Sequence, residues 1–332
     1  MKFLLTAINA KFIHSNPAIY SLRAGVGEKL QPYVELAEFT INESLESILE
    51  GIWKRQPKVI GFSCYIWNWK LIREILTELP KILPDTEIWL GGPEVTYDGP
   101  GLLSEFPQVT GIMVGEGEVT FREVLGQYVR EAESTGQSEQ QPEPDSIEQQ
   151  AADRTGTLAG KSVAERFGQI PGLCLASGYT APRELTDLTT LPFLYEDMEP
   201  FTNRIIYYET SRGCPYRCSY CLSSIDKKVR LRDIDVVKRE LQFFLDQNVK
   251  QVKFIDRTFN CDHKHAMEIW EYIYKHDNGV TNFHFEISAD ILREEEIVLL
   301  NRFRPGLAQL EIGVQSTNPE TIRAIHRVMD VD

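Results

Sequence analysis

Residues 208–221 read YETSRGCPYRCSYC, and this stretch decides how the second half of the chain is organised. It begins inside a predicted strand at 205–209 and then spaces three thiols as CxxxCxxC, at Cys214, Cys218 and Cys221. Six cysteines in 332 residues are too few for a disulfide framework. Three thiols crowded into one short loop therefore indicate a metal site.

Three thiolates on one loop suit an iron–sulfur cluster. They can hold three irons of a four-iron four-sulfur (4Fe-4S) cubane, which leaves the fourth iron without a protein ligand. Structural zinc is the alternative, but it prefers four closed ligands. The nearest further candidates, Cys261 and His263, belong to another predicted strand–helix unit. The sequence therefore favours a cluster with one open coordination position.

A regular alternation of strands and helices surrounds the cysteine loop. The later predicted strands are at 251–255, 282–288 and 309–314, and the predicted helices are at 232–246, 264–274, 294–303 and 319–328. Parallel strands need crossover connections, and four strand–helix units in succession are typical of a β/α barrel or part of one. We therefore predict an α/β fold with a barrel-like domain at 201–332.

The first part of the chain alternates in the same way. Short β-branched or aromatic runs at 2–7, 34–41, 59–65, 87–90 and 111–114 predict strands, and amphipathic stretches such as 17–29 and 68–82 predict helices. This order predicts a doubly wound, Rossmann-like domain at 1–130. Ligands of such sheets bind beyond the carboxyl ends of the strands, here at 9–16, 63–68, 91–94 and 115–118.

An acidic stretch separates the two predicted domains. Between 131 and 153 the chain has no Lys or Arg and seven acidic residues, Glu131, Glu133, Glu139, Glu143, Asp145, Glu148 and Asp153. A segment with so few apolar residues cannot offset the entropy cost of becoming ordered. We predict a flexible insertion or linker at 131–168, followed by a bridging segment at 169–200.

The overall charge restricts the possible partners. A formal net charge of -14 at pH 7 would repel a phosphate backbone, so nucleic acid is a poor candidate partner. No apolar run reaches the roughly 18 residues that span a bilayer. The first residues also lack the cleavage site of a secretory signal. The sequence predicts a cytoplasmic protein without a membrane partner.

The cysteine loop resembles the signature of the radical S-adenosylmethionine (SAM) superfamily, because CxxxCxxC follows the first barrel strand and an aromatic residue, Tyr220, precedes the last cysteine. The resemblance implies that the open iron of the 4Fe-4S cluster chelates the amino and carboxylate groups of SAM. One electron, from a donor such as flavodoxin or ferredoxin, then cleaves SAM to methionine and a 5'-deoxyadenosyl radical, which abstracts hydrogen. Tyr220 would lie against the adenine.

The same resemblance implies further SAM contacts on the later strands. Asp256 stands, by position only, where the superfamily has its glycine-rich contact with the SAM amino group. The runs at 285–290 and 311–316 look like the third and fourth strands of the branch that includes oxygen-independent coproporphyrinogen oxidase. In that branch a Glu, a Gln and an Arg hold SAM, and here they map to Glu286, Gln315 and Arg327.

Barrels of this superfamily usually have six strands. The chain ends at Asp332 after the fourth predicted strand–helix unit, so we expect a partial radical SAM barrel in a truncated reading or fragment. The substrate, a small molecule or another kind, would be selected by loops at the barrel mouth and by whatever follows Asp332. The sequence does not identify it.

The first domain resembles the cobalamin-binding domain of cobalamin-dependent radical SAM proteins. Glycines at strand ends let a bulky ligand approach the backbone, and a serine hydroxyl can bond its polar tail. The resemblance implies a cobalamin site that includes Ser63, Gly91, Gly92 and Glu116.

The motif DxHxxG, which supplies a cobalt-ligating histidine in other cobalamin proteins, is absent around His14. Phe12 and Pro17 stand at its Asp and Gly positions. Cobalamin is therefore expected to bind without a histidine on cobalt, and the alternative is a domain of this shape that has lost cobalamin altogether.

Three functions are consistent with these features. The leading hypothesis is a radical SAM enzyme that uses cobalamin, and the transfer of a methyl group to an unactivated carbon is one reaction that such an enzyme could carry out. A methylthiotransferase is the second, but such proteins carry another cysteine trio in the first domain, where this chain has Cys64 alone. The third is a non-catalytic iron–sulfur electron carrier or redox sensor, which would need no SAM site.

Overall fold

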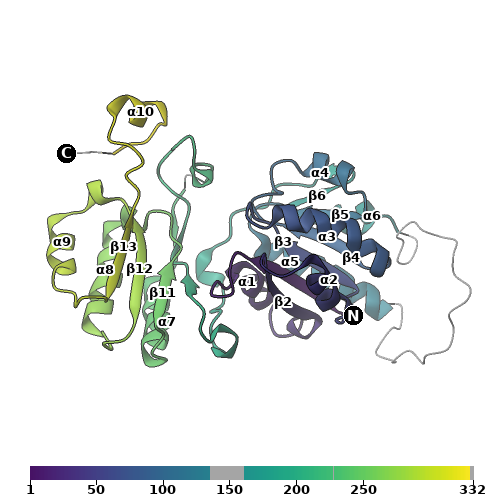
Figure 1. Cartoon of the computed structure of the whole chain (residues 1–332), viewed down its shortest axis with the longest axis horizontal. Coiled ribbons are helices and arrows are strands. Elements are labelled where there is room, and N and C mark those ends of the chain that lie inside the picture. Colours follow the sequence, from purple (N-terminus) through teal and green to yellow (C-terminus); the bar gives the residue numbers. More distant parts are fainter. Residues whose placement is uncertain (135–160, 227, 330–332) are drawn as a thin grey trace, which may run out of the picture. The chain divides into compact units, whose positions relative to one another are not determined.

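The computed structural model describes residues 1–134, 161–226 and 228–329. The chain folds into two compact units, Met1–Thr186 and Asp187–Asp332 (Figure 1). Among the helices of these described ranges, none is both long and apolar enough to cross a bilayer.

The first unit is built on a seven-stranded sheet in the order β2-β1-β3-β4-β5-β6-β7. Its five parallel strands are β1 (Phe3–Asn9), β2 (Val34–Thr40), β3 (Val59–Ser63), β4 (Glu87–Gly91) and β5 (Val109–Met113). Two short strands, β6 (Leu173–Leu175) and β7 (Gly178–Tyr179), extend the sheet in antiparallel fashion. The predicted α/β fold with a Rossmann-like first domain is confirmed.

Helices cover both faces of this sheet, because alternate strand residues face opposite sides. Leu4 and Ile8 of β1 pack in one core with α2 (Leu45–Trp53), α3 (Trp69–Ile82) and α4 (Gly99–Glu105). Phe3 and Leu5 pack in the other core with α1 (Pro17–Gly25), α5 (Gly117–Ser134) and α6 (Val163–Phe167). Polar caps begin two of these helices, since Asn16 accepts from the Ile19 amide and Ser44 from the Ser47 amide.

The boundary between the two units differs from the one expected from composition. Helix α5 continues to Ser134, so Glu131 and Glu133 are helical, and the helix α6 packs in the core of the first unit. Strand β6, at the start of the expected bridging segment, pairs with β5. Residues up to Thr186 therefore belong to the first unit. The expectation of flexibility for 135–160 lies outside the described residues.

A buried ion-pair network explains why α6 is held against the sheet. The Arg166 side chain is 1% exposed, and its guanidinium lies 3.0 Å from a Glu87 carboxylate oxygen and 2.9 Å from a Glu131 carboxylate oxygen. The Tyr128 hydroxyl donates to Glu87 at 2.7 Å. The network joins β4, α5 and α6, three elements that composition alone does not connect.

The second unit is built on four parallel strands in the order β13-β12-β11-β8. They are β8 (Ile206–Tyr208), β11 (Gln251–Phe254), β12 (Asn282–Ile287) and β13 (Ala308–Ile312), and the helices α7 (Ile234–Asp246), α8 (His263–Lys275), α9 (Glu294–Leu300) and α10 (Pro319–Ala324) follow them in turn. The strand order follows the chain order, as in a β/α barrel. A separate pair, β9 (Ser211–Arg212) and β10 (Arg230–Leu231), flanks the cysteine loop.

The two faces of the second sheet differ in chemistry. Aromatic side chains form the face that packs with the helices, with Phe285 against Phe254, Phe259 and Trp270. On the alternate positions Lys253 lies 3.1 Å from Glu311, and His284 lies 3.0 Å from the same carboxylate. The interior face of this partial barrel is therefore charged.

Candidate functional site

The cysteine loop of the second unit is closed by backbone contacts. Gly213 has a φ of +94°, and a side chain there would meet the Lys228 carbonyl oxygen at 2.5 Å, so this position requires glycine. The Cys214 amide donates to the Asp226 carbonyl at 2.9 Å, and the Cys221 amide donates to the Cys218 carbonyl at 3.1 Å. The loop between β9 and β10 is therefore folded tightly at the carboxyl end of β8.

The three thiols of this loop differ in exposure. Cys214 and Cys218 are buried, at 8% and 6% exposed, and Cys221 is partly exposed. In the part of the chain that the structure describes, no three His, Cys, Asp or Glu side chains are gathered closely enough to hold a metal. The donor chemistry nevertheless fits a 4Fe-4S cluster, because all three thiols come from one closed loop and two are screened from water.

The Asp256 carboxylate is bound to the start of the cysteine loop. Its carboxylate is 1% exposed and accepts from the Thr210 amide at 3.1 Å, from the Thr210 hydroxyl at 2.6 Å and from the Ser211 hydroxyl at 2.6 Å. Burial raises the pKa of this carboxyl, and the hydrogen bonds from Ser211 and Thr210 oppose that shift. Both carboxylate oxygens bind Thr210 or Ser211, so Asp256 fixes the entry to the cysteine loop, and its contact with the SAM amino group stays a prediction.

Three predicted SAM contacts, Tyr220, Gln315 and Arg327, come together around Gly313. The Arg327 guanidinium donates to the Tyr220 hydroxyl at 3.1 Å and to the Gly313 carbonyl. Gln315 has a φ of +64°, and its side-chain amide lies over Gly313, where an added side chain would meet it at 2.7 Å.

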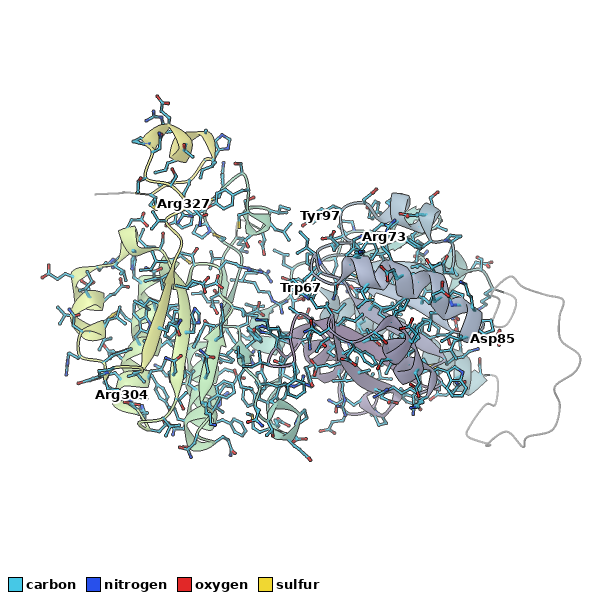
Figure 2. The ribbon with its side chains drawn as sticks, viewed as in Figure 1. Trp67, Arg73, Asp85, Tyr97, Arg304 and Arg327 are labelled. Carbon is cyan, nitrogen blue, oxygen red and sulfur yellow. The ribbon has the colours of Figure 1, made fainter. Side chains whose placement is uncertain are left out.

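The segment after β13 is also bound directly to the cysteine loop. The Ser219 amide donates to the Ile325 carbonyl at 2.9 Å. Figure 2 shows Arg327 at one end of the second unit and Arg304, which precedes β13, at the other. The Tyr220 and Arg327 pair therefore lies at the carboxyl end of the strands.

The surroundings of the Arg327 guanidinium raise its pKa. Burial would lower this pKa, but the hydrogen bond and charge interaction with Tyr220 and the nearby Cys218 thiol outweigh burial, so the pKa is raised. The pKa of Tyr220 is raised, chiefly by burial. The Arg327 guanidinium is thus a cation beside the cysteine loop.

The fifth predicted SAM contact, Glu286, lies one residue before the end of β12 and in register with Glu311 of β13. Its carboxylate is 3.7 Å from the Lys253 ammonium group. Glu286 therefore belongs to the charged interior face, close to the strand ends.

Sequence reasoning missed two residues beside Cys214. The Thr258 hydroxyl lies 3.5 Å from the Cys214 sulfur, and Tyr216 of the cysteine loop interacts with Ser288 after β12. Asn260 holds these loops together, since its amide donates to the Ser288 carbonyl at 2.8 Å and accepts from the Ser288 amide at 3.0 Å. The available signal was the run of polar residues that directly follows β11.

In the first unit, two of the predicted cobalamin contacts have structural partners. Gly92 has a φ of +111°, and a side chain there would meet the Cys64 carbonyl oxygen at 2.5 Å. The Glu116 carboxylate accepts from the Thr186 amide at 2.7 Å. Gly92 thus allows two loops to approach each other, and Glu116 anchors the end of the first unit.

The other strand-end positions leave more room for a ligand. The Ser63 hydroxyl, at the end of β3, accepts from the Asn16 side chain at 3.2 Å. Gly91 would tolerate a side chain at ordinary distances, the nearest atom being 3.7 Å away on Met113. Gly115, with a φ of +80°, faces open space.

Large apolar side chains are exposed on the loops after β1, β3 and β4. Ile66 is 81% exposed, and the others are Phe12, Ile13, Trp67 and Tyr97. Figure 2 shows Trp67 and Tyr97 toward one end of the first unit and Asp85, which precedes β4, at the opposite end. Exposed apolar groups gathered at one edge are typical of a binding surface for an apolar or amphipathic partner.

Comparisons with known proteins agree with this two-part arrangement. A family model described as the B12 binding domain matches residues 4–125, and one described as the radical SAM superfamily matches residues 208–332. Over 228 residues the chain is 27% identical to 2-(S-pantetheinyl)-carbapenam-3-carboxylate methyltransferase of Streptantibioticus cattleyicolor, a match that covers 65% of this chain and 29% of that protein.

Two solved structures share the fold. TsrM, a radical SAM methyltransferase from Kitasatospora setae with cobalamin and a 4Fe-4S cluster bound, has a TM-score of 0.64 at 18% identity, over 97% of this chain and 60% of that chain. OxsB, a cobalamin-dependent SAM radical enzyme with aqua-cobalamin and SAM bound, has a TM-score of 0.69 at 17% identity, over 97% and 45%. The chain spans less than two thirds of each of these proteins.

The fold and the site define a class of protein. Its members are two-domain α/β proteins with a three-cysteine loop at the carboxyl end of a parallel β/α sheet. Together with the two family models, the fold and the site show that the chain belongs to the radical SAM superfamily, among the members that carry a B12 binding domain. The resemblance drawn from the sequence is confirmed.

Proposed function

We propose that the chain is the cofactor-binding part of a cobalamin-dependent radical SAM enzyme that transfers a methyl group to an unactivated carbon of a small molecule. The observation that carries the proposal is the cysteine loop, which closes at the carboxyl end of a parallel sheet with Tyr220 and Arg327 against it. Two of the proteins described above support the reaction, because the Streptantibioticus cattleyicolor protein and TsrM are methyltransferases by name.

Cys214, Cys218 and Cys221 are the residues that would hold the 4Fe-4S cluster. When bound, the cluster supplies one-electron reductive cleavage of SAM, with the electron coming from a donor such as flavodoxin or ferredoxin. The loop keeps Cys214 and Cys218 away from water, while the greater exposure of Cys221 leaves one side of the loop accessible to a second ligand.

Tyr220, Gln315 and Arg327 are the residues that would hold SAM beside the cluster, with Glu286 at the end of β12. Arg327 positions the Tyr220 ring by hydrogen bonding its hydroxyl, so that the ring can lie against the adenine. Asp256 acts indirectly, because it fixes Thr210 and Ser211 at the start of the loop.

The strand-end loops of the first unit are where cobalamin would bind. A corrin ring is flat and largely apolar, which suits the exposed Ile66, Trp67 and Tyr97 side chains, and Trp67 stacks on Tyr65 with ring centres 4.3 Å apart. Ser63, Gly91 and Gly115 leave polar and open positions for its tail.

The proposal is tested by purifying the chain without oxygen and measuring iron, sulfide and corrinoid. We expect roughly four irons per chain and uptake of added cobalamin. Iron without any affinity for corrinoid would remove the methyl-transfer part, and a full cluster that does not cleave SAM after reduction with dithionite would favour an electron carrier or sensor.

The SAM contacts make a sharper prediction. Arg327→Gln is expected to weaken SAM binding to the cluster-loaded protein by about 10-fold to 100-fold, because a hydrogen bond that involves a charged group contributes roughly 1.5–3 kcal/mol. The iron content should stay the same. Equilibrium dialysis with labelled SAM measures the affinity.

Arg323→Gln is the matched control, since Arg323 lies in the same segment but its side chain is exposed. It should bind SAM as tightly as the unmodified chain. Equal affinity in both variants would show that the residues after β13 are assigned incorrectly, and loss of iron from Arg327→Gln would assign Arg327 to the cysteine loop.

A further inference from the structure

The Thr258 hydroxyl is a polar neighbour of Cys214 that the proposed function does not use. Its oxygen lies 3.5 Å from the Cys214 sulfur, within hydrogen-bond range for sulfur, and the two residues are 7% and 8% exposed. The Cys214 amide is bound elsewhere, to the Asp226 carbonyl. The hydroxyl therefore approaches the sulfur in a place from which most water is excluded.

The direction of this hydrogen bond follows from the chemistry of the ligand. A free thiol can donate or accept, whereas a cysteine thiolate that holds iron has no proton and can only accept. The Thr258 hydroxyl has one proton, which in this structure can also reach the Arg257 carbonyl at 2.8 Å. With a thiolate at Cys214, the contact persists only if Thr258 donates to the sulfur.

The Thr258 side chain is held in place by its surroundings. The Cys261 amide donates to the Thr258 carbonyl at 3.0 Å, and Asn260 bonds to both the amide and the carbonyl of Ser288. The Thr258 backbone has a φ of -153° and a ψ of 83°. These contacts hold the backbone on either side of Thr258, so the hydroxyl oxygen stays beside the sulfur and only its proton has to turn from the Arg257 carbonyl.

We propose that Thr258 sets the reduction potential of the 4Fe-4S cluster by donating a hydrogen bond from its hydroxyl to the Cys214 sulfur. One-electron reduction adds negative charge to the cluster and its sulfur ligands, so a donor at a sulfur stabilises the reduced form more than the oxidised form. The low local dielectric strengthens the effect. This inference rests on the proposed function, since it requires the cluster to be bound.

The test compares Thr258→Val with Thr258→Ser in the full chain, loaded with iron and sulfide without oxygen. Valine keeps the shape and removes the hydroxyl, and serine keeps the hydroxyl. The fraction of reduced cluster is measured by electron paramagnetic resonance at a series of fixed solution potentials. Iron and sulfide contents are measured on the same samples.

In Thr258→Val the ratio of reduced to oxidised cluster at a fixed potential should fall about tenfold, which for one electron is a midpoint potential about 59 mV more negative. Thr258→Ser should stay within about twofold of the unmodified chain. A fully loaded Thr258→Val protein with an unchanged potential would overturn the inference and leave the proposed function intact.

Two other outcomes are also decisive. If the unmodified chain holds no 4Fe-4S cluster, the proposed function fails and this inference fails with it. If Thr258→Val cannot be loaded, Thr258→Ala is measured in its place. Failure of both to hold iron while Thr258→Ser holds it would also overturn the inference, because the hydroxyl would then serve to assemble the loop.

Discussion

Cys218→Ala is expected to lower the iron bound by the chain from roughly four per molecule to a background level. A cubane needs three thiolates from the loop, and Cys218 is one of the two that are screened from water. Alanine offers no donor at that position, and the charged neighbour Arg327 cannot replace a thiolate. Iron and sulfide analysis of protein prepared without oxygen measures the effect.

Cys174→Ala is the matched control for this experiment. Cys174 is also buried, but it lies in β6 of the first unit, where it pairs with Ile112 of β5. Its replacement should leave the iron content unchanged. If Cys218→Ala kept its full complement of iron, or if the loop bound zinc in place of iron, the assignment of the cluster would be wrong. The experiment tests the cluster and not the reaction that follows.

Arg166→Met is expected to destabilise the first unit by about 3–5 kcal/mol, the usual cost of removing one partner from a buried ion pair. The Arg166 guanidinium bridges Glu87 and Glu131, and methionine would remove the cation that lies between these two partly buried carboxylates. Hydrogen exchange followed by mass spectrometry resolves the two units. The amides of β4 should exchange faster in the variant, and those of β11 and β12 should not change.

Arg130→Met provides the comparison, because Arg130 lies on the same helix as Glu131 but has an exposed side chain. Its effect should stay within about 0.5 kcal/mol. Similar protection of β4 in Arg166→Met and in the unmodified chain would mean that the carboxylates are solvated locally, and that the network contributes little to the stability of the fold.

The parts of the fold that the sequence predicted well are those written in local patterns. The strand–helix alternation predicts the parallel sheet of the first unit, and the CxxxCxxC spacing puts three thiols on one loop whatever the surrounding packing. The structure of residues 131–168 was harder to predict, because amino-acid composition is an average over a stretch of residues. The composition did not indicate that Arg166 pairs with Glu131 and thereby places α6 in the core of the first unit.

The site was only partly predictable, for a geometric reason. Asp256 and Thr258 follow the same strand two residues apart, yet Asp256 binds the entry to the cysteine loop and Thr258 reaches the Cys214 sulfur. Which of them would face which neighbour depends on how the loop folds over β11. The role of a glycine at a strand end is ambiguous in a similar way. A glycine that lets another loop approach and a glycine that lets a ligand approach look the same in the sequence, because both lack a side chain.

The close approach of Gly92 to the Cys64 backbone has a thermodynamic consequence for any ligand that binds to the first unit. Because the turn after β4 and the turn after β3 share backbone hydrogen bonds, from the Cys64 amide to Gly91 and from the Glu94 amide to Cys64, neither can rearrange alone. The two turns lost their conformational entropy when the protein folded, so the binding of a ligand costs little further entropy for ordering them. The turns after β3 and β4 should therefore form a rigid binding surface. A ligand whose shape does not match this surface should bind weakly, and a matching ligand should bind tightly through few contacts.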